Sequence, residues 1–438
     1  MSIPLSDAAH LLRRAGFGGT SDEVASLAAS TNRQAAVARL LDFSANPPVT
    51  NPGVSTTEGL WDELMFLRNW WLDRMATAPA PLQEKLTLFW HGHFACQQDG
   101  IYPIGDFEQN QVFRNFGAGK FRPLVQAVSI DPVMLVFLDG FRNSKYGPNQ
   151  NFSRELMELF TLGVDEYTLD DIREASRAWT GHSVEWEENV YYRPYVFNAW
   201  DHDEGQKTFF GITRNWNGPE IVNEICTGTK KPIVARFIAR KLWSFFAYPD
   251  PEESVLASIS ASFLASDLDI RELCRAIFLH ERFYSTTARQ GLVRSPVEFI
   301  VAALRYGGLS AVEMGAADYM WNMGQVLFAP PNVAGWKQNG YWLSPSTAWS
   351  RASFAKAVRE DLAPWENPAF LAETVSLSVP AAVQAAFDAF GIDAPTANTR
   401  SHLEAWLTAE RTSVSWQWPN RIRNLILLTL LSPEFQTA

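Results

Sequence analysis

The sequence has little cysteine and little histidine. Cys96, Cys226 and Cys274 are its three cysteines, and they lie far apart without a CxxC pair. A disulfide framework and a structural zinc knuckle are therefore not expected. The chain of 438 residues has only seven histidines, so any close pair of them merits attention as a potential pair of metal ligands.

Long apolar runs, excess positive charge and the common catalytic motifs are also missing. No run of eighteen apolar residues is present, which predicts no membrane span. The N-terminus, MSIPLSDAAHLLRR, lacks the pattern of a signal peptide, so a cytoplasmic location is expected. The net charge of −11 argues against nucleic acid as a partner. GxSxG, Walker, GxGxxG and HExxH motifs are absent, which removes the usual support for several enzyme classes.

Helix signals dominate what is present. Ser295 as N-cap, Pro296 at the first helical position and Glu298 completing a capping box start one predicted helix, and Gly307 is expected to end it. We predict a mainly α, large multi-helix fold with a small β-hairpin region inserted around 183–211, where aromatic and alternating residues are separated by turn residues.

The length exceeds that at which a single core usually stops growing, so more than one lobe is expected. We predict an N-terminal helical lobe over 1–165, a connecting helix and β excursion over 166–216, and a C-terminal helical lobe over 217–438. The lobes are expected to pack as one body.

Two histidines flank a glycine in FWHGHF. Positions i and i+2 of a helix point about 200° apart, so His91 and His93 share a target only if the helix breaks at Gly92. They are then either a ligand pair or a helix end that buries two polar rings.

Two further segments carry charged groups. In NFSRELMELFTLG, Glu155 and Glu158 lie on one helix face beside apolar positions, with Arg154 as a candidate counter-charge. An exposed acidic stripe is the simpler alternative. In DHDEG, His202 and Asp203 could bind a metal or hold a general base, or could only stabilise a turn. The loop FAPPNVAGWKQNGYWLSP, Phe328 to Pro345, is of a kind that is often functional.

Several motifs, in this order, resemble the DUF1800 family of large bacterial proteins: HLLRRAGFG, FWHGHF, NFSRELMELFTLG, HDEGQKTFFG, RFIARKLW, SPVEFIVAALR and PPNVAGW. The resemblance spans roughly His10 to Phe354. It implies that relatives commonly look exported, which points to extracellular polymers such as polysaccharides as candidate ligands of the family, and it implies no particular reaction. This chain departs from that pattern in lacking an export signal. The positions that fall on family-like motifs are His91, His93, Arg154, Glu155, Glu158, His202, Asp203, Gly205 and Lys207.

The leading hypothesis is a metal-dependent enzyme that binds one divalent transition metal: iron, zinc or copper. A set of three nitrogens and one carboxylate suits non-haem oxidation, which we favour slightly, or hydrolysis. The predicted ligands are His91, His93, His202 and Glu155. The predicted catalytic groups are Glu158 or Asp203 as general base, and Arg154 or Lys207 to neutralise a substrate anion.

Two alternatives stay open. A metal-free carbohydrate-active enzyme would pair carboxylates with tryptophan platforms, for which the candidates are Trp90, Trp179, Trp336 and Trp342. A non-catalytic binding or assembly protein would use the same polar residues as a structural network. The expected partner is a small-molecule or glycan substrate, with a partner protein as a further option, and the sequence does not indicate an oligomeric state.

Overall fold

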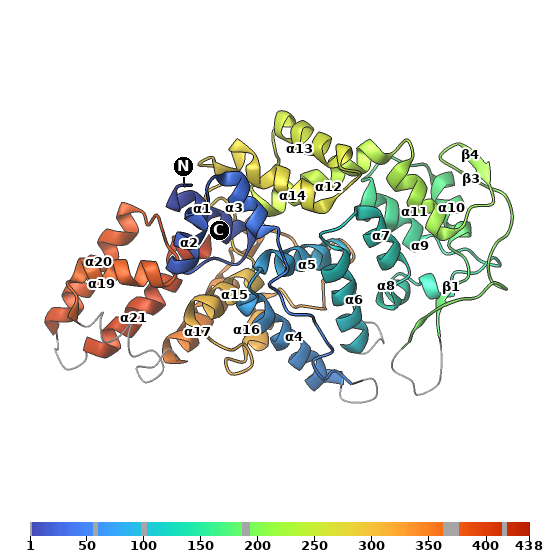
Figure 1. Ribbon diagram of the computed structural model, residues 1–438. Coiled ribbons are helices and arrows are strands. Elements are labelled where there is room, and N and C mark those ends of the chain that lie inside the picture. Colours follow the sequence, from blue (N-terminus) through green and yellow to red (C-terminus); the bar gives the residue numbers. More distant parts are fainter. Residues whose placement is uncertain (1, 56–59, 98–102, 186–192, 362–375, 414–417) are drawn as a thin grey trace.

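Helices make up most of the molecule (Figure 1). The computed structural model describes residues 2–55, 60–97, 103–185, 193–361, 376–413 and 418–438. Within these residues, strands form only two small antiparallel sheets. The predicted mainly α class is confirmed. None of the helices in this described part combines the length and apolar character needed to cross a membrane.

The first hydrophobic core is built by helices from the N-terminal part and the middle of the chain. Its elements are α1 (Leu5–Ala15), α2 (Ser21–Ala28), α3 (Arg33–Leu40), α5 (Pro81–His93), α6 (Pro103–Phe116), α7 (Phe121–Ser129), α8 (Pro132–Phe137), α9 (Asn151–Glu155), the π-helix η2 (Leu156–Thr161), α10 (Leu169–Ala178), α11 (Gly218–Thr227), α12 (Lys231–Phe246), α13 (Glu253–Ala265), α14 (Ile270–Leu279) and the short helix η3 (Glu281–Tyr284).

The second hydrophobic core combines a further early helix, and a few side chains of α5 and α6, with the C-terminal helices. Its elements are α4 (Leu60–Thr77), α15 (Pro296–Gly307), α16 (Ala316–Met323), α17 (Pro345–Asp361), α19 (Val379–Ala389), α20 (Ala397–Ser413), α21 (Trp418–Leu430) and α22 (Pro433–Gln436). Helix α4 packs directly on α15 and α16, so the two cores do not follow the order of the chain. The predicted lobe boundaries stay a prediction.

Helix α5 lies between the two cores. Its side chains Leu86 and Phe89 belong to the first core, and Leu88 belongs to the second. Figure 1 shows α5 in the middle of the molecule, with the C-terminal helices α19 to α21 at one end and the strands at the other. The end of α5 is therefore enclosed by segments from both halves of the structure.

The β excursion consists of two hairpins. Strands β1 (His182–Val184) and β2 (Tyr195–Phe197) pair antiparallel, as do β3 (Lys207–Phe209) and β4 (Ile212–Arg214). The predicted insertion between helices is confirmed. The pattern indicates strands because short aromatic and β-branched runs alternate with turn residues there.

The start of α15 follows its predicted capping. Ser295 accepts a hydrogen bond from the Glu298 N–H, and the Glu298 side chain accepts one from the Ser295 N–H. The stop differs from the prediction by one residue. Gly307 is still helical, and Gly308 adopts the left-handed conformation that ends the helix.

Candidate functional site

Helix α5 runs without a break through Gly92 to His93. His91 and His93 therefore face different neighbours, as the helical geometry requires when no break occurs. The N–H of Phe328 donates to Nε2 of His91 at 3.0 Å, and the rings of Trp71 and Trp336 pack against the imidazole. Burial lowers the pKa of His91 to about 3, so its ring is neutral.

His93 is held on the other side of the helix. Its Nε2–H donates to the carbonyl of Phe160 at 3.0 Å, and its Nδ1 accepts from the Lys241 amine at 3.2 Å. Burial and the nearby Lys241 charge lower the pKa of His93 well below its usual value. Each histidine of the pair thus connects α5 to a different part of the chain.

One partner of His93, the Phe160 carbonyl, comes from the end of a π-helix, and the other, Lys241, comes from α12. The last carbonyls of a helix have no partner within it, and η2 leaves those of Leu159 and Phe160 free. Lys241 donates to the Leu159 carbonyl at 3.0 Å, beside the bond between His93 and Phe160. A cation at a helix C-terminus is favourable because the carbonyl dipoles point toward it. Three distant segments, at the end of α5, in η2 and in α12, converge at this point.

The loop after Gln325 docks on the opposite side of Gly92. Gly335 has φ +74°, and a Cβ there would lie 2.2 Å from the Gly92 carbonyl oxygen. The close approach therefore requires glycine. Phe328 and Asn339 in the same loop also have positive φ, 62° and 56°. Such strained conformations are held only where the surroundings determine them, and they concentrate at functional sites.

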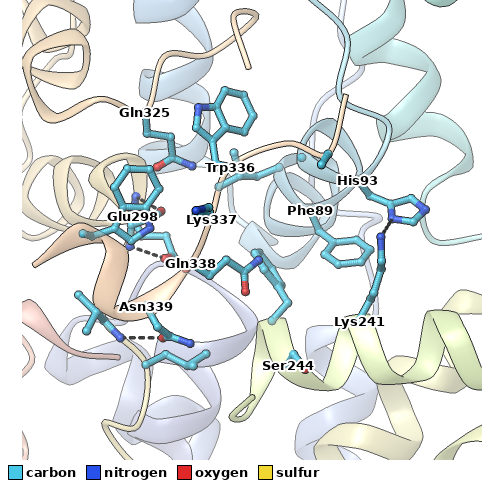
Figure 2. Close-up of a pocket in the computed structure, with 18 of the residues that line it drawn as sticks. Phe89, His93, Lys241, Ser244, Glu298, Gln325, Trp336, Lys337, Gln338 and Asn339 are labelled. Carbon is cyan, nitrogen blue, oxygen red and sulfur yellow. Dashed lines mark hydrogen bonds between the residues drawn. The ribbon is translucent and has the colours of Figure 1, made fainter. Parts of the chain in front are cut away.

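A pocket of about 290 Å³ lies where these segments meet, at the junction of the two cores. Figure 2 shows His93 and Lys241 on one side and Trp336, Gln325 and Glu298 on the other. The volume is at the small end of the range for small-molecule sites. The lining residues are Leu88, Phe89, Gly92, His93, Arg240, Lys241, Ser244, Phe245, Leu292, Val293, Ser295, Glu298, Gln325, Ala334, Trp336, Lys337, Gln338, Asn339 and Trp342.

The charge of the pocket wall is positive. Arg240, Lys241 and Lys337 line it, against the single carboxylate of Glu298. That carboxylate is already ion-paired with the buried Lys85. The pocket lining therefore has three basic side chains and one carboxylate, whose charge the buried Lys85 neutralises.

Further buried cations surround the same carboxylate. Arg14, Arg294 and Arg351 are almost fully buried and interact electrostatically with Glu298. Burial, which disfavours the charged form, lowers the pKa of Arg14 to about 9 and that of Arg294 to about 10. This part of an otherwise acidic protein thus carries an excess of positive charge.

The predicted glutamate pair lies elsewhere on the π-helix region. Tyr167 donates to Glu158 at 2.7 Å. Burial and the Glu158 charge raise the pKa of Glu155. Arg154 is exposed, and none of the three lines the pocket described above.

The predicted DHDEG group stabilises the turn that leads into β3. His202 bonds through Nδ1 to the Thr180 carbonyl at 2.8 Å. Arg177 holds Asp203 with two hydrogen bonds, of 2.7 and 3.2 Å. Although burial alone would raise the pKa of Asp203, Arg177 lowers it.

Lys207 completes the same turn. Its amine donates to the Gly205 carbonyl at 3.0 Å and to Asn215 Oδ1 at 2.8 Å. These contacts fit the alternative in which the DHDEG residues only stabilise a turn.

The structure therefore does not gather the predicted metal ligands into one site. In the ranges that the structure describes, no group of three or more His, Cys, Asp or Glu side chains is placed to hold a metal ion. His91, His93 and His202 bond to three separate segments, and Glu155 lies with Glu158 on the π-helix region. Binding of iron, zinc or copper stays a prediction, and elemental analysis of the purified protein tests it.

The predicted tryptophans divide into two pairs. Trp336 and Trp342 line the pocket. Trp90 is fully buried and donates its indole N–H to the Gly117 carbonyl at 2.8 Å, while Trp179 packs on Phe152 in the core. The first pair thus lies where a ligand could touch it, and the second has a structural role.

Motif chemistry alone does not point to Lys241, Arg240, Lys337 and Glu298 as pocket residues. Two signals in the sequence nevertheless indicate them. RFIARKLW carries three cations among apolar residues, Arg240 and Lys241 being two of them, and the Trp- and Gly-rich loop carries KQN between two of its tryptophans. Polar groups in such surroundings are costly without partners, which makes them candidates for a site.

The fold and the geometry define the class: a mainly helical protein with a cationic pocket, lined in part by tryptophan, at the junction of two hydrophobic cores. The family model described as "Protein of unknown function (DUF1800)" matches residues 10–437, nearly the whole chain. The chain belongs to this family. Comparison with curated proteins and with solved structures gives no match.

Proposed function

We propose that the protein binds an acidic carbohydrate, a sugar that bears a carboxylate, in the pocket between its two cores. The observation that carries this proposal is the pairing of excess positive charge with two tryptophans in the lining of one pocket. Such a combination fits a ligand that has an anionic group and a flat, partly apolar body.

The cations argue for a carboxylate. Arg240 can bind a carboxylate with two parallel hydrogen bonds, and Lys337 adds a second charge from the facing loop. Glu298 does not compete for them, because Lys85 already neutralises it.

The remaining wall argues for a sugar. Trp336 offers a rigid, partly exposed aromatic face, with the buried Trp342 beside the pocket. Gln325, Gln338 and Asn339 offer amide groups that match hydroxyl groups. A few polar groups placed in an apolar pocket are the usual basis of orientation and specificity.

The test is a comparison of D-galacturonate with D-galactose by isothermal titration calorimetry. The two sugars differ in the carboxylate, so we expect galacturonate to bind at least about tenfold more tightly, which corresponds to about 1.4 kcal/mol. Trp336→Ala should abolish binding. Trp349→Ala removes a 77% exposed tryptophan outside the pocket and is the matched control.

Equal binding of the two sugars, or none at all with a folded protein, would contradict the proposal. The metal-dependent enzyme predicted from the sequence is tested separately, through metal content and through a His91→Ala/His93→Ala variant.

A further inference from the structure

We infer that the ligand of this pocket carries a second acidic group, which makes it a uronic acid with a phosphate ester, and that Gln325 and Asn339 bind this group through their amide N–H donors. This inference rests on the proposed function and deepens it, because it names the substrate class of the same pocket. Two features of the pocket wall support it, the direction of its hydrogen bonds and the number of its charges.

The side-chain amide of Gln325 is oriented by the start of helix α15. The Val297 N–H, one of the first donors of that helix and hence without a partner inside it, donates to Oε1 of Gln325 at 2.9 Å. A backbone N–H can only donate, so the amide oxygen lies at this contact and the NH2 group at the other end. Gln325 is buried and lines the pocket. Its NH2 group is left for a ligand, since none of the described residues accepts a hydrogen bond from it.

Asn339 repeats this arrangement. The Val293 N–H donates to Oδ1 of Asn339 at 3.2 Å, so the NH2 group is again the free end of the amide (Figure 2). Figure 2 shows Gln325 and Asn339 on the same side of the pocket, opposite Lys241. This side of the pocket therefore presents two amide groups with donors only.

The one carboxylate of the lining does not reverse this polarity. One oxygen of Glu298 accepts from Lys85, and the other accepts from the Ser295 N–H at 2.8 Å. A hydroxyl group both donates and accepts, whereas an ionised phosphate only accepts. A wall whose amides only donate, and whose carboxylate already has partners, therefore fits an oxyanion better than it fits a hydroxyl group.

The number of charges indicates the same class of ligand. Three cations line the pocket, Arg240, Lys241 and Lys337, while Lys85 neutralises Glu298. A uronate supplies only one negative charge. A phosphate ester adds about 1.5 to 2 negative charges at pH 7, together with three acceptor oxygens, so a phosphorylated uronate approaches the charge of the wall.

The donors lie on two opposing walls. Arg240 belongs to α12, as does Lys241, whereas Gln325, Lys337 and Asn339 belong to the segment that follows α16. A ligand with one acidic group satisfies only one wall, and a ligand with acidic groups at two points of its ring satisfies both. The carboxylate thus meets Arg240, and the phosphate meets Lys337 and the two amides.

The test compares four sugars by isothermal titration calorimetry in a phosphate-free buffer: D-galactose, D-galacturonate, galactose 1-phosphate and galacturonate 1-phosphate. The set measures the contribution of the carboxylate with and without the phosphate, and the reverse. We expect galacturonate 1-phosphate to bind at least about tenfold more tightly than galacturonate. This comparison uses the wild-type chain and needs no variant.

Two variants assign the phosphate to the amides. Gln325→Glu and Asn339→Asp keep the oxygen that accepts from the backbone N–H and replace the NH2 group with a charged oxygen. Each should weaken binding of galacturonate 1-phosphate several-fold more than binding of galacturonate, with thermal unfolding as the check on folding. Gln338→Glu is the matched control, because it adds the same charge at an exposed side chain of the same loop, and it should affect the two ligands about equally.

Equal binding of galacturonate and galacturonate 1-phosphate would overturn the inference, and so would an effect of Gln338→Glu as selective as that of Gln325→Glu. The two proposals fail differently. If galacturonate binds more tightly than galactose and the phosphate adds nothing, only the second acidic group is refuted. If the carboxylate adds nothing in either pair of sugars, the proposed function itself is refuted.

Discussion

Glu84 is a single buried carboxylate that joins three helices. On α5, it accepts two hydrogen bonds from Arg114 of α6, both 2.8 Å, and one each from Arg74 and Trp71 of α4. Although burial alone would raise its pKa, these arginines lower it. Glu84 is therefore ionised in the folded protein, and its negative charge holds the three helices together.

Replacing Glu84 with Gln should destabilise the protein strongly. The substitution keeps the shape but leaves the buried Arg114 without a counter-charge, so we expect a loss of about 3–5 kcal/mol in the free energy of unfolding. Chemical denaturation measures it. Glu253→Gln, which breaks the exposed pair with Arg236, is the control and should leave the free energy of unfolding nearly unchanged. A similar small effect for Glu84→Gln would show that the network does not stabilise the fold.

Asp131 is a buried carboxylate with the opposite behaviour. Burial raises its pKa to about 7. The folded state thus holds a proton that the unfolded chain has already released above pH 4. Because the folded state binds this proton more tightly than the unfolded chain, protonation of Asp131 stabilises the fold at low pH. This stabilisation is complete below the pKa of Asp131 in the unfolded chain and is lost as the pH rises toward 7.

Asp131→Asn should remove this pH dependence. Asparagine is as good an N-cap as aspartate, and its Oδ1 can still accept from the Met134 N–H and from Gln109. Relative to wild type, the variant should gain of the order of 2–4 kcal/mol between pH 4.5 and 8. Urea unfolding at the two pH values measures the difference, with exposed Asp170→Asn as the control. If the free energy of unfolding changed with pH in the same way in wild type and in Asp131→Asn, the prediction would be wrong.

At the scale of elements, the contact between Gly335 and Gly92 connects the two halves of the pocket. The loop that carries Trp336, Lys337 and Asn339 can lie against α5 only because Gly335 has no side chain where it meets the Gly92 carbonyl oxygen. The position of the loop at the rim of the pocket thus depends on the close approach of the Gly335 and Gly92 backbones, and only indirectly on the residues that would touch a ligand.

Gly335→Ala should therefore weaken ligand binding. Its positive φ and the clash with the Gly92 carbonyl cost about 1–3 kcal/mol, part of which displaces the loop. Galacturonate titration and thermal unfolding measure the two effects. Gly340→Ala is a matched control in the same loop, because a Cβ there meets nothing within 4 Å. Equal effects of the two substitutions would show that the Gly335 contact is unimportant.

The elements are largely predictable from the sequence, whereas the convergence of their side chains is not. Capping boxes and helical spacing predict α15 and its neighbours, and short alternating runs predict the hairpins, because these are local properties. The π-helix is invisible in the sequence, since its apolar spacing resembles that of an α-helix. Its free carbonyls, and hence the roles of His93 and Lys241, follow only from tertiary structure.

At the scale of the whole molecule, the sequence predicts two helical lobes but cannot indicate that α4 packs with the C-terminal helices. Such long-range pairing leaves no local signal. For the same reason FWHGHF suggests a shared ligand, whereas its two imidazoles point to different halves of the structure. The pocket at the junction of the two cores is a product of that pairing.

The net charge of the molecule and the local charge of the pocket lead to opposite predictions for how salt affects the binding of an acidic ligand. The molecule carries −11 and should repel an anion at long range, so added salt would strengthen binding if the net charge dominated. The pocket wall is positive, and its cations attract the anion at contact distance. Salt screens interactions beyond about 10 Å at 0.1 M, and it also weakens attraction to partly exposed cations such as Arg240.

We expect the local field to dominate. Raising NaCl from about 20 to 300 mM should weaken galacturonate binding several-fold, because screening of the pocket cations outweighs screening of the remote acidic surface. Calorimetric titrations at the two salt concentrations measure the change, with galactose as the neutral reference. Lys337→Gln should reduce the salt dependence, since it removes one of the attracting charges from the pocket wall. Tighter binding at high salt would mean that the acidic surface controls access, and would place the anion site outside this pocket.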